Sequence, residues 1–215
     1  MSDTLLVSEL FKSIQGESTY AGRVCVFVRL TGCNLNCAYC DTGYARTGGR
    51  TVGLNTLLHE VTAFSCDLVE ITGGEPLMQP GTAEFAQLLL EKGKTVLVET
   101  NGSCDIGVLP QRCVRIVDIK CPSSGMSHTF LKRNLQQLQP HDEIKCVIGN
   151  RDDFNWALSF IRKHELHNKV TVLFSPVTGS VTPDQLAAWI LEGDIPVRMQ
   201  LQLHKIIWGA EARGV

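Results

Sequence analysis

Apolar segments of two different periodicities alternate along most of the chain. Runs of β-branched and other apolar residues predict strands at residues 5–11, 24–30, 67–72, 95–99, 114–119, 143–148, 170–174 and 197–203. Apolar residues at helical spacing predict helices at residues 54–64, 85–93, 127–138, 154–161 and 182–190. Strands that alternate with helices form a parallel sheet with right-handed crossovers. About six such units indicate an α/β fold, a partial (β/α)6-type parallel barrel in a single domain over residues 1–215.

Polar, glycine and cysteine motifs recur where these predicted strands end. They are Cys33 to Cys40, Thr72 to Glu75, Thr100-Asn101, Lys120 to Ser123, Ser175-Pro176 and His204. The carboxyl ends of parallel strands meet at one edge of a sheet or barrel, and sites are built at that edge. The sequence therefore predicts an enzyme with its site at this edge.

Three of the nine cysteines, Cys33, Cys37 and Cys40, form a C-x3-C-x2-C pattern in one short polar loop. Thiolates suit an iron–sulfur cluster or zinc. Three ligands leave one iron of a [4Fe-4S] cluster open, and that iron could chelate S-adenosylmethionine. One electron would then cleave the sulfonium and release a 5′-deoxyadenosyl radical. A zinc site would need a fourth ligand at metal-site spacing, whereas the next cysteine, Cys66, stands alone.

Further candidate residues lie on either side of the cysteine loop. The Gln15-Gly16-Glu17 turn presents an amide and a carboxylate, either to a polar ligand or to solvent. Arg29 lies in an apolar strand and needs a partner, because burying a lone charge is costly. A carboxylate matches its planar fork, and either a structural acid or a substrate would supply it. Gly73-Gly74 would let the backbone approach a ligand closely.

Composition narrows the class of protein. The 215 residues are 44% hydrophobic and 20% charged, as in globular chains. The net charge of −2 argues against a free nucleic-acid binder. There is no leading apolar targeting segment and no apolar run long enough to cross a bilayer, so we expect a cytoplasmic protein without a membrane partner. The remaining cysteines are expected to be small buried apolar residues: Cys25, Cys66, Cys104, Cys113, Cys121 and Cys146.

With these motifs in hand, the chain resembles the 7-carboxy-7-deazaguanine synthase family of radical S-adenosylmethionine enzymes. The resemblance covers nearly the whole chain and rests on Ile14 to Glu17, the cysteine loop with Asp41-Thr42, Ile71 to Pro76, Glu99 to Gly102, Asp118 to Ser123 and Gln202 to Lys205. It implies a partial barrel of the radical SAM kind with a shortened cluster-binding region. It also implies ring contraction of 6-carboxy-5,6,7,8-tetrahydropterin with loss of ammonia, begun by hydrogen abstraction at the carbon that bears the carboxylate.

The resemblance also assigns roles to residues. Cys33, Cys37 and Cys40 would hold the [4Fe-4S] cluster, and Thr42 would offer its hydroxyl to Mg²⁺. The pterin would contact Ile14, Gln15, Gly16, Glu17, Arg29, Thr72 and His204, with Arg29 on its carboxylate. S-adenosylmethionine would contact Tyr39, Cys40, Asp41, Gly74, Glu75, Cys121, Pro122, Ser123 and Ser175. The tail, Gly209 to Val215, receives no role.

Expected partners are the small pterin substrate, an electron donor such as a flavodoxin, and a second copy of the chain in a homodimer. Two other functions share the cysteine loop. An activase would make a glycyl radical on a protein and would need a groove for a polypeptide. An iron–sulfur carrier or zinc module would not be an enzyme, and a carrier would bind every iron through cysteine.

Overall fold

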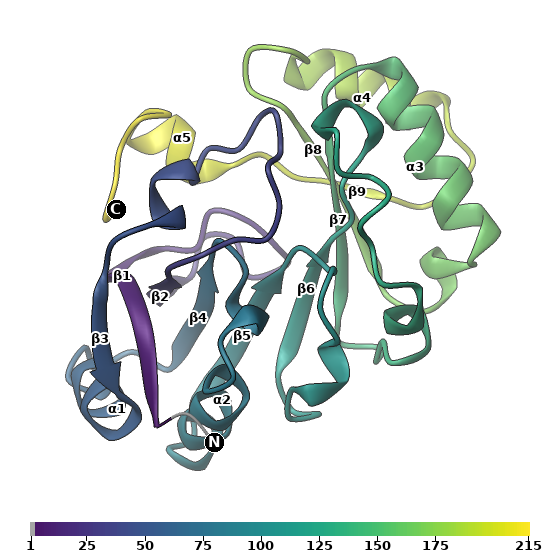
Figure 1. Ribbon diagram of the computed structural model, residues 1–215. Coiled ribbons are helices and arrows are strands. Elements are labelled where there is room, and N and C mark those ends of the chain that lie inside the picture. Colours follow the sequence, from purple (N-terminus) through teal and green to yellow (C-terminus); the bar gives the residue numbers. More distant parts are fainter. Residues whose placement is uncertain (1–2) are drawn as a thin grey trace.

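A computed structural model describes residues 3–215, so residues 1 and 2 of the predicted domain lie outside it. Its sheet has nine strands in the order β3-β1-β2-β4-β5-β6-β7-β8-β9 (Figure 1). The strands are β1 (Thr4–Ile14), β2 (Val24–Leu30), β3 (Arg50–Gly53), β4 (Leu68–Gly73), β5 (Thr95–Thr100), β6 (Val114–Asp118), β7 (Glu143–Ile148), β8 (Thr171–Pro176) and β9 (Arg198–Met199). The helices are α1 (Leu54–Thr62), α2 (Thr82–Glu91), α3 (Arg151–Lys163), α4 (Pro183–Glu192) and α5 (Leu203–Ile207).

The parallel part of the sheet runs from β2 through β4 to β9. It curves but does not close, because β3 and β9 are its two ends. The predicted partial barrel is therefore confirmed. The first strand is an exception to the expected parallel arrangement, since β1 pairs antiparallel with both β2 and β3. The short strand β3 was not predicted from the sequence.

Two segments differ from the sequence-based expectation. The predicted helix 127–138 is wrong: this segment contains only a short 3-10 turn, Lys132–Gln136. Asn134 is buried there, and its side chain donates to the carbonyls of Gly102 and Cys104 at 3.0 and 2.8 Å. These bonds hold the segment against the loop after β5 as irregular structure. The predicted strand 197–203 is reduced to β9, and its last residue begins α5.

The predicted start of the helix at Thr182-Pro183 is confirmed. Thr182 caps α4 by accepting the backbone N–H of Gln185, and the Gln185 side chain accepts the N–H of Thr182 in return. This capping box satisfies two backbone donors that a helix start leaves without partners.

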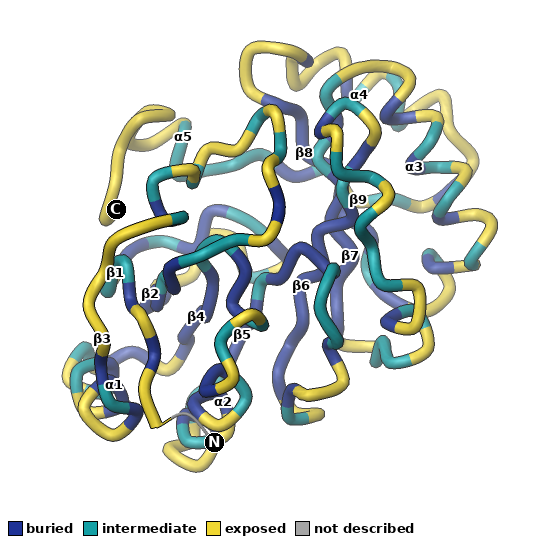
Figure 2. The backbone as a smooth tube through the Cα atoms, viewed as in Figure 1, coloured by how far each residue is buried: buried dark blue, intermediate teal, exposed yellow. Residues whose placement is uncertain are grey.

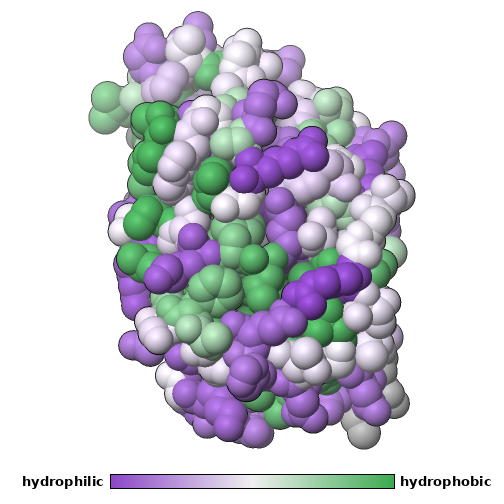
Figure 3. Space-filling model, turned by 90° about the vertical axis from the view of Figure 1, so that its left-hand side faces the viewer, coloured by the Kyte–Doolittle hydropathy of each residue, from purple (hydrophilic) through white to green (hydrophobic). Residues whose placement is uncertain are grey.

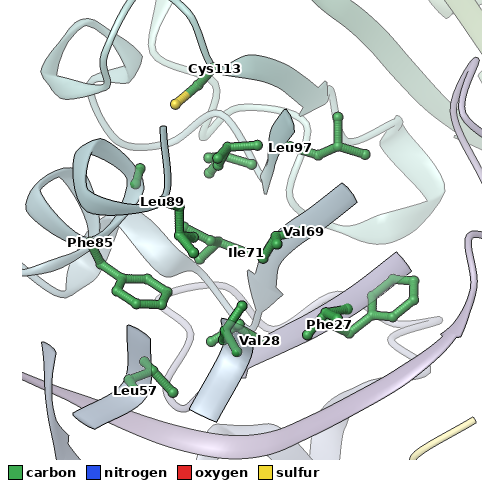
Figure 4. Packing of buried hydrophobic residues seen from close by; sticks show 14 of the residues in the cluster. Phe27, Val28, Leu57, Val69, Ile71, Phe85, Leu89, Leu97 and Cys113 are labelled. Carbon is green, nitrogen blue, oxygen red and sulfur yellow. The ribbon is translucent and has the colours of Figure 1, made fainter. Parts of the chain in front are cut away.

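The apolar core is formed by buried residues of the strands and of the helices packed against them. Figure 2 shows that the strands of the parallel sheet are mostly buried. In Figure 4, Leu57 of α1 and Phe85 of α2 pack toward Ile71 of β4. Most of the remaining cysteines are buried as expected: Cys25, Cys66, Cys113, Cys121 and Cys146. The expectation is wrong for Cys104, which is half-buried in the loop after β5. Within residues 3–215, no helix combines the length and the apolar character needed to span a membrane.

Candidate active site

A cavity of about 680 Å³ opens at the edge where the parallel strands end. Residues of β2, β4, β5, β6 and β7 line it, together with segments that follow β8 and β9. Alternate strand residues face the cavity because successive side chains point to opposite faces of a sheet. The gathering of polar motifs at this edge is thus confirmed for most strands.

Most of the site residues predicted from the sequence line this cavity. They are Ile14, Gln15, Gly16, Glu17, Arg29, Cys33, Cys37, Tyr39, Cys40, Asp41, Thr42, Thr72, Gly74 and His204. A smaller set is not among the lining residues: Glu75, Cys121, Pro122, Ser123 and Ser175.

Four charged side chains from four neighbouring strands form what we call the cavity floor: Glu70, Glu99, Asp118 and Lys145. Lys145 is only 5% exposed, and its Nζ lies 3.6 Å from Asp118 Oδ2 and in contact with Glu99. Burial by itself would lower the pKa of Lys145, but the acidic groups around it raise that pKa well above the ordinary value. The acidic groups of the floor therefore favour the charged form of Lys145.

Glu17 is held above the floor by three donors. Lys145 Nζ lies 2.9 Å from its Oε2, Gln200 Nε2 donates to Oε2 at 3.2 Å, and Gln202 Nε2 donates to Oε1 at 2.8 Å. Burial opposes ionisation of Glu17, but the charge of Lys145 and the bond from Gln202 hold its pKa below the usual value. The turn predicted from the sequence thus presents an ionised carboxylate in a fixed position.

The amide of Gln15 has a defined orientation. Its Oε1 accepts the backbone N–H of Glu17 at 3.0 Å, and its Nε2 donates to Glu70. Burial, and then the nearby charge of Glu99, raise the pKa of Glu70 well above its ordinary value. Glu70 therefore favours the neutral acid, while Glu17 favours the carboxylate.

Gly16 and His204 meet across the cavity wall. A Cβ at Gly16 would lie 2.7 Å from His204 Nδ1, so only glycine allows this approach. The Gly16 carbonyl also accepts the N–H of Leu203 at 3.0 Å, which anchors the start of α5. Burial lowers the pKa of His204, which favours the neutral imidazole.

Arg29 has a structural acid beside it. Its Nε donates to Glu9 Oε2 at 2.7 Å, and the hydroxyl of Tyr44 donates to the same oxygen at 2.8 Å. The guanidinium also lies 5.9 Å from the ring centre of Phe11. Within residues 3–215, the two terminal nitrogens of Arg29 form no hydrogen bond with a protein group, and the residue lines the cavity. One edge of the fork is therefore used by Glu9, and the other remains available to a ligand.

The cysteine loop (residues 33–42) and the tail (residues 209–215) form what we call the cavity rim. Cys33 and Cys37 are half-buried, and Cys40 is exposed. Among residues 3–215, no three His, Cys, Asp or Glu groups lie close enough to share one metal ion. The donor set fits an iron–sulfur cluster, in which each cysteine sulfur binds a different iron. The sulfur of Cys33 receives hydrogen bonds that suit a thiolate, from Leu35 N–H at 3.5 Å and Asn101 Nδ2 at 3.8 Å.

The Gly73-Gly74-Glu75 segment holds the cysteine loop against the sheet. A Cβ at Gly73 would lie 2.1 Å from the Leu30 carbonyl, and a Cβ at Gly74 would lie 2.1 Å from the Gly32 carbonyl. The glycines therefore permit close backbone packing as well as lining the cavity. Glu75 is fully buried, and its carboxylate accepts the N–H groups of Leu77 and Asn101 and the hydroxyl of Thr100.

Polar residues at the end of the cysteine loop are tied to α5. Lys205 Nζ lies 2.6 Å from Asp41 Oδ2, and the Thr42 hydroxyl donates to Asp41 Oδ1 at 3.0 Å. Burial would raise the pKa of Asp41, but Lys205 and the bond from Thr42 hold it well below its usual range. Because Thr42 donates its only hydroxyl hydrogen, its oxygen lone pairs stay free to bind a hard cation. Tyr39 donates its hydroxyl to the Val147 carbonyl at 3.2 Å, which fixes the middle of the loop.

The predicted residues that do not line the cavity lie beneath or beside it. Ser123 donates its backbone N–H and its hydroxyl to Asp153, which also accepts the N–H of Gly149. Asp153 thus joins the loops after β6 and β7. Ser175 is fully buried, and its hydroxyl has no hydrogen-bond partner within residues 3–215.

Several lining residues were given no role from the sequence. They include the cavity floor, Phe11, Tyr44 and the whole tail from Gly209 to Val215. The guanidinium of Arg213 stacks on the ring of Tyr44, 4.1 Å from its centre, and holds the tail over the Arg29 side of the cavity. Charges within otherwise apolar strands signal the floor, whereas no local sequence signal identifies the tail.

Sequence comparisons agree with this geometry. The Radical SAM superfamily model matches residues 27–190. A 7-carboxy-7-deazaguanine synthase of Koribacter versatilis is 45% identical and covers 97% of this chain and 99% of its own. A protein of the same name from Chlorobaculum tepidum is 44% identical, with 98% and 97% covered.

Solved structures show that the fold is shared more widely than the sequence. QueE from Escherichia coli superposes with a TM-score of 0.76 at 21% identity and covers 93% of this chain and 94% of its own. Streptococcus suis SuiB, solved bound to its precursor peptide SuiA, superposes with a TM-score of 0.57 at 10% identity, with 81% and 47% covered. Because the fold itself does not fix the substrate, the function has to be argued from the site.

Proposed function

The chain belongs to the 7-carboxy-7-deazaguanine synthases of the radical SAM superfamily, and from that premise we propose that it converts 6-carboxy-5,6,7,8-tetrahydropterin to 7-carboxy-7-deazaguanine with loss of ammonia. Membership makes it a radical SAM lyase of 7-deazapurine biosynthesis. The activase and the carrier or zinc module fit less well, because relatives over nearly the full length bear the synthase name.

One observation carries the proposal. A single cavity joins the cysteine loop to Arg29, whose guanidinium has one edge available. A carboxylate at Arg29 would be bound by a planar fork that matches its geometry. A small acid bound there would lie within the same cavity as the cysteine loop.

The family implies a [4Fe-4S] cluster and S-adenosylmethionine. When bound, the pair supplies a 5′-deoxyadenosyl radical that abstracts a hydrogen atom from the substrate. Cys33, Cys37 and Cys40 would hold the cluster, and Tyr39, Asp41 and Gly74 would contact the nucleotide from the lining of the cavity. The Glu75 carboxylate already accepts hydrogen bonds from Asn101 and Thr100. Glu75 would therefore affect nucleotide binding indirectly, by holding these two residues in place. The roles of the 121–123 turn and of Ser175 stay predictions.

The polar residues around the floor would recognise the heterocycle. A pterin presents N–H donors and carbonyl acceptors along one edge, and a site with matched partners rejects analogues that lack them. The ionised Glu17 and the oriented amide of Gln15 would accept and donate along that edge. Thr72 donates to Glu99 at 3.2 Å, which places a further polar pair beside them. The neutral imidazole of His204 and the backbone of Ile14 and Gly16 would complete the wall.

Magnesium would bind at Thr42 together with substrate oxygens. This ion prefers oxygen ligands and often binds through few protein groups plus substrate. The proposal is supported by the free lone pairs of the Thr42 oxygen and by the ionised Asp41 next to it. Positive charge there would orient the substrate while its ring contracts.

We propose further that an electron donor such as a flavodoxin reduces the cluster, that the chain acts as a homodimer, and that it works in the cytoplasm. Cysteine ligands must stay reduced, which suits that compartment.

The homodimer is supported by exposed apolar residues of α5 and its end, with Ile206 64% and Ile207 53% exposed. Hydrophobic and hydrophilic side chains mix on the face shown in Figure 3. Light scattering of the purified protein would test the dimer.

The deciding experiment is anaerobic incubation of the reconstituted protein with reductant, S-adenosylmethionine and the carboxylated tetrahydropterin. Mass spectrometry should find a product lighter than the substrate by ammonia, and magnesium should raise its yield. Protein that contains iron and cleaves S-adenosylmethionine but leaves this pterin unchanged would retain the radical chemistry and exclude the substrate.

A further inference from the structure

Asn34 of the cysteine loop forms a closed ring of hydrogen bonds with two residues of the loop after β5, Asn101 and Ser103. Ser103 Oγ donates to Asn101 Oδ1 at 2.6 Å, and Asn101 Nδ2 donates to Asn34 Oδ1 at 3.2 Å. Asn34 Nδ2 completes the ring by donating to Ser103 Oγ at 2.8 Å. Within the ring each residue gives one hydrogen and accepts one, which leaves the second Nδ2 hydrogen of Asn101 for another acceptor.

The ring determines which way the amide of Asn101 faces. Its Oδ1 also accepts the backbone N–H of Ser103 at 3.0 Å, so two donors hold the oxygen on that side. A flipped amide would place its NH₂ group against these same donors. The second hydrogen of Nδ2 is thereby directed to the sulfur of Cys33, 3.8 Å away.

The position of Asn101 is fixed from below as well. Asn101 is itself only 7% exposed. Its backbone N–H donates to Glu75 Oε2 at 2.7 Å, and the preceding Thr100 hydroxyl donates to Glu75 Oε1 at 2.8 Å. The buried Glu75 therefore places Asn101, and the ring orients it toward Cys33.

We propose that Asn101 is a positioning residue that raises the reduction potential of the iron–sulfur cluster by hydrogen bonding to the Cys33 thiolate. Hydrogen bonds to the sulfurs are one of the factors that set the potential of such a cluster. Reduction adds negative charge to the cluster and its ligands, so a donor at the ligand sulfur stabilises the reduced form more than the oxidised form. The inference rests on the proposed ligation of the cluster by Cys33.

The test is an anaerobic redox titration of the reconstituted holoprotein, with the reduced cluster followed by electron paramagnetic resonance. Asn101→Leu keeps a similar size and removes the donor. We expect about a tenfold lower ratio of reduced to oxidised cluster at a given potential, which for one electron is a shift of about 59 mV to more negative values. Ser103→Ala should shift the potential less and in the same direction, because the backbone N–H of Ser103 still holds the amide.

Asn155→Leu on the exposed surface of α3 is the matched control and should titrate as the unaltered protein does. An unshifted potential in Asn101→Leu with the full iron content would overturn the proposal. Should that variant not retain its cluster, an unchanged potential in Ser103→Ala overturns it instead. Failure of the unaltered protein to bind iron at all would contradict the proposed function, and that result is distinct from an unshifted potential.

Discussion

The floor and the rim of the cavity differ in how completely their polar groups are partnered. On the floor, Lys145 is nearly buried among Glu17, Glu99 and Asp118. On the rim, the cysteine thiols are half-buried or exposed, and the tail is mostly exposed. The floor is carried by strands in the middle of the sheet, whereas the rim is carried by loops and a chain end.

Because of this difference, we expect substitutions on the floor and on the rim to have different effects on stability and activity. The buried ion pairs of the floor form only when the chain folds, so substitutions there should reduce stability as well as activity. The cysteine and Thr42 side chains of the rim lie in a loop and are half-buried or exposed, so changes there should reduce activity with little effect on the metal-free fold. The five predictions that follow test this separation, from the largest expected effect to the smallest.

Cys37→Ala should abolish cluster binding and product formation together. Losing the radical source removes the whole rate enhancement, which is at least about 10⁶-fold for enzymes in general. Iron content and product formation in anaerobic assays measure both losses. Cys66→Ala is the matched control: this buried core cysteine should leave the iron content unchanged and lower stability instead. Full iron content in Cys37→Ala would remove Cys37 from the site.

Lys145→Met should destabilise the protein by about 3–5 kcal/mol, because three carboxylates would then face one another without their buried cation. Urea unfolding of the metal-free protein measures this change. Arg50→Met removes the cation of an exposed pair with Glu60 and should cost at most about 1 kcal/mol. Equal losses in the two variants would mean that burial of the floor cation adds nothing to stability beyond an exposed ion pair.

Arg29→Lys should raise the KM for the carboxylated pterin about tenfold to a hundredfold, since hydrogen bonds to a charged group are worth about 1.5–3 kcal/mol. The charge is retained, but the planar fork is lost. Steady-state kinetics measure KM and kcat separately. Glu9→Gln removes only the structural partner of Arg29 and should raise KM less. The same KM in both variants would mean that Arg29 serves Glu9 and not the substrate.

Thr42→Ala should raise the magnesium concentration needed for half-maximal product formation by about tenfold, since one hydrogen-bonding oxygen contributes about 1 kcal/mol or slightly more. Product formation is followed as magnesium is titrated, with the iron content checked in parallel. Thr42→Ser keeps the hydroxyl and should behave as the unaltered protein. Unchanged magnesium dependence in Thr42→Ala excludes this residue as a ligand.

His204 should make stability depend on pH in a defined direction. Burial lowers its pKa below the ordinary 6.5, so the unfolded chain binds the proton more tightly than the folded chain does. Stability is therefore full above pH 6.5 and falls as the pH drops toward the lowered pKa. Urea midpoints at pH 7.5 and 5.5 should differ more in the unaltered protein than in His204→Gln. Equal differences would show that His204 does not contribute.

The parts of the site predicted from the sequence are those encoded by adjacent residues. The cysteine loop, the Gln15-Gly16-Glu17 turn and the Gly73-Gly74 pair each carry their chemistry within a few positions, and all line the cavity. The strands were also predictable where, as in β2, the sequence is rich in β-branched and aromatic residues.

The parts that were missed depend on contacts between distant segments. Glu70, Glu99 and Lys145 come from three strands, and only the assembled sheet shows that they face one cavity. Each of them, like Arg29, is a charge in an apolar strand and therefore needs a partner. Segment 127–138 has helical spacing, but the hydrogen bonds of Asn134 to the loop after β5 determine its structure.

The position of the tail has a practical consequence for anyone who produces this protein. Residues up to Val215 line the cavity, and Arg213 stacks on Tyr44 beside Arg29. An affinity tag fused after Val215 would extend the segment that lines this cavity. In Figure 1 the first strand begins near the bottom of the view, away from the C-terminus at the upper left, so a purification handle placed ahead of it would lie apart from the tail.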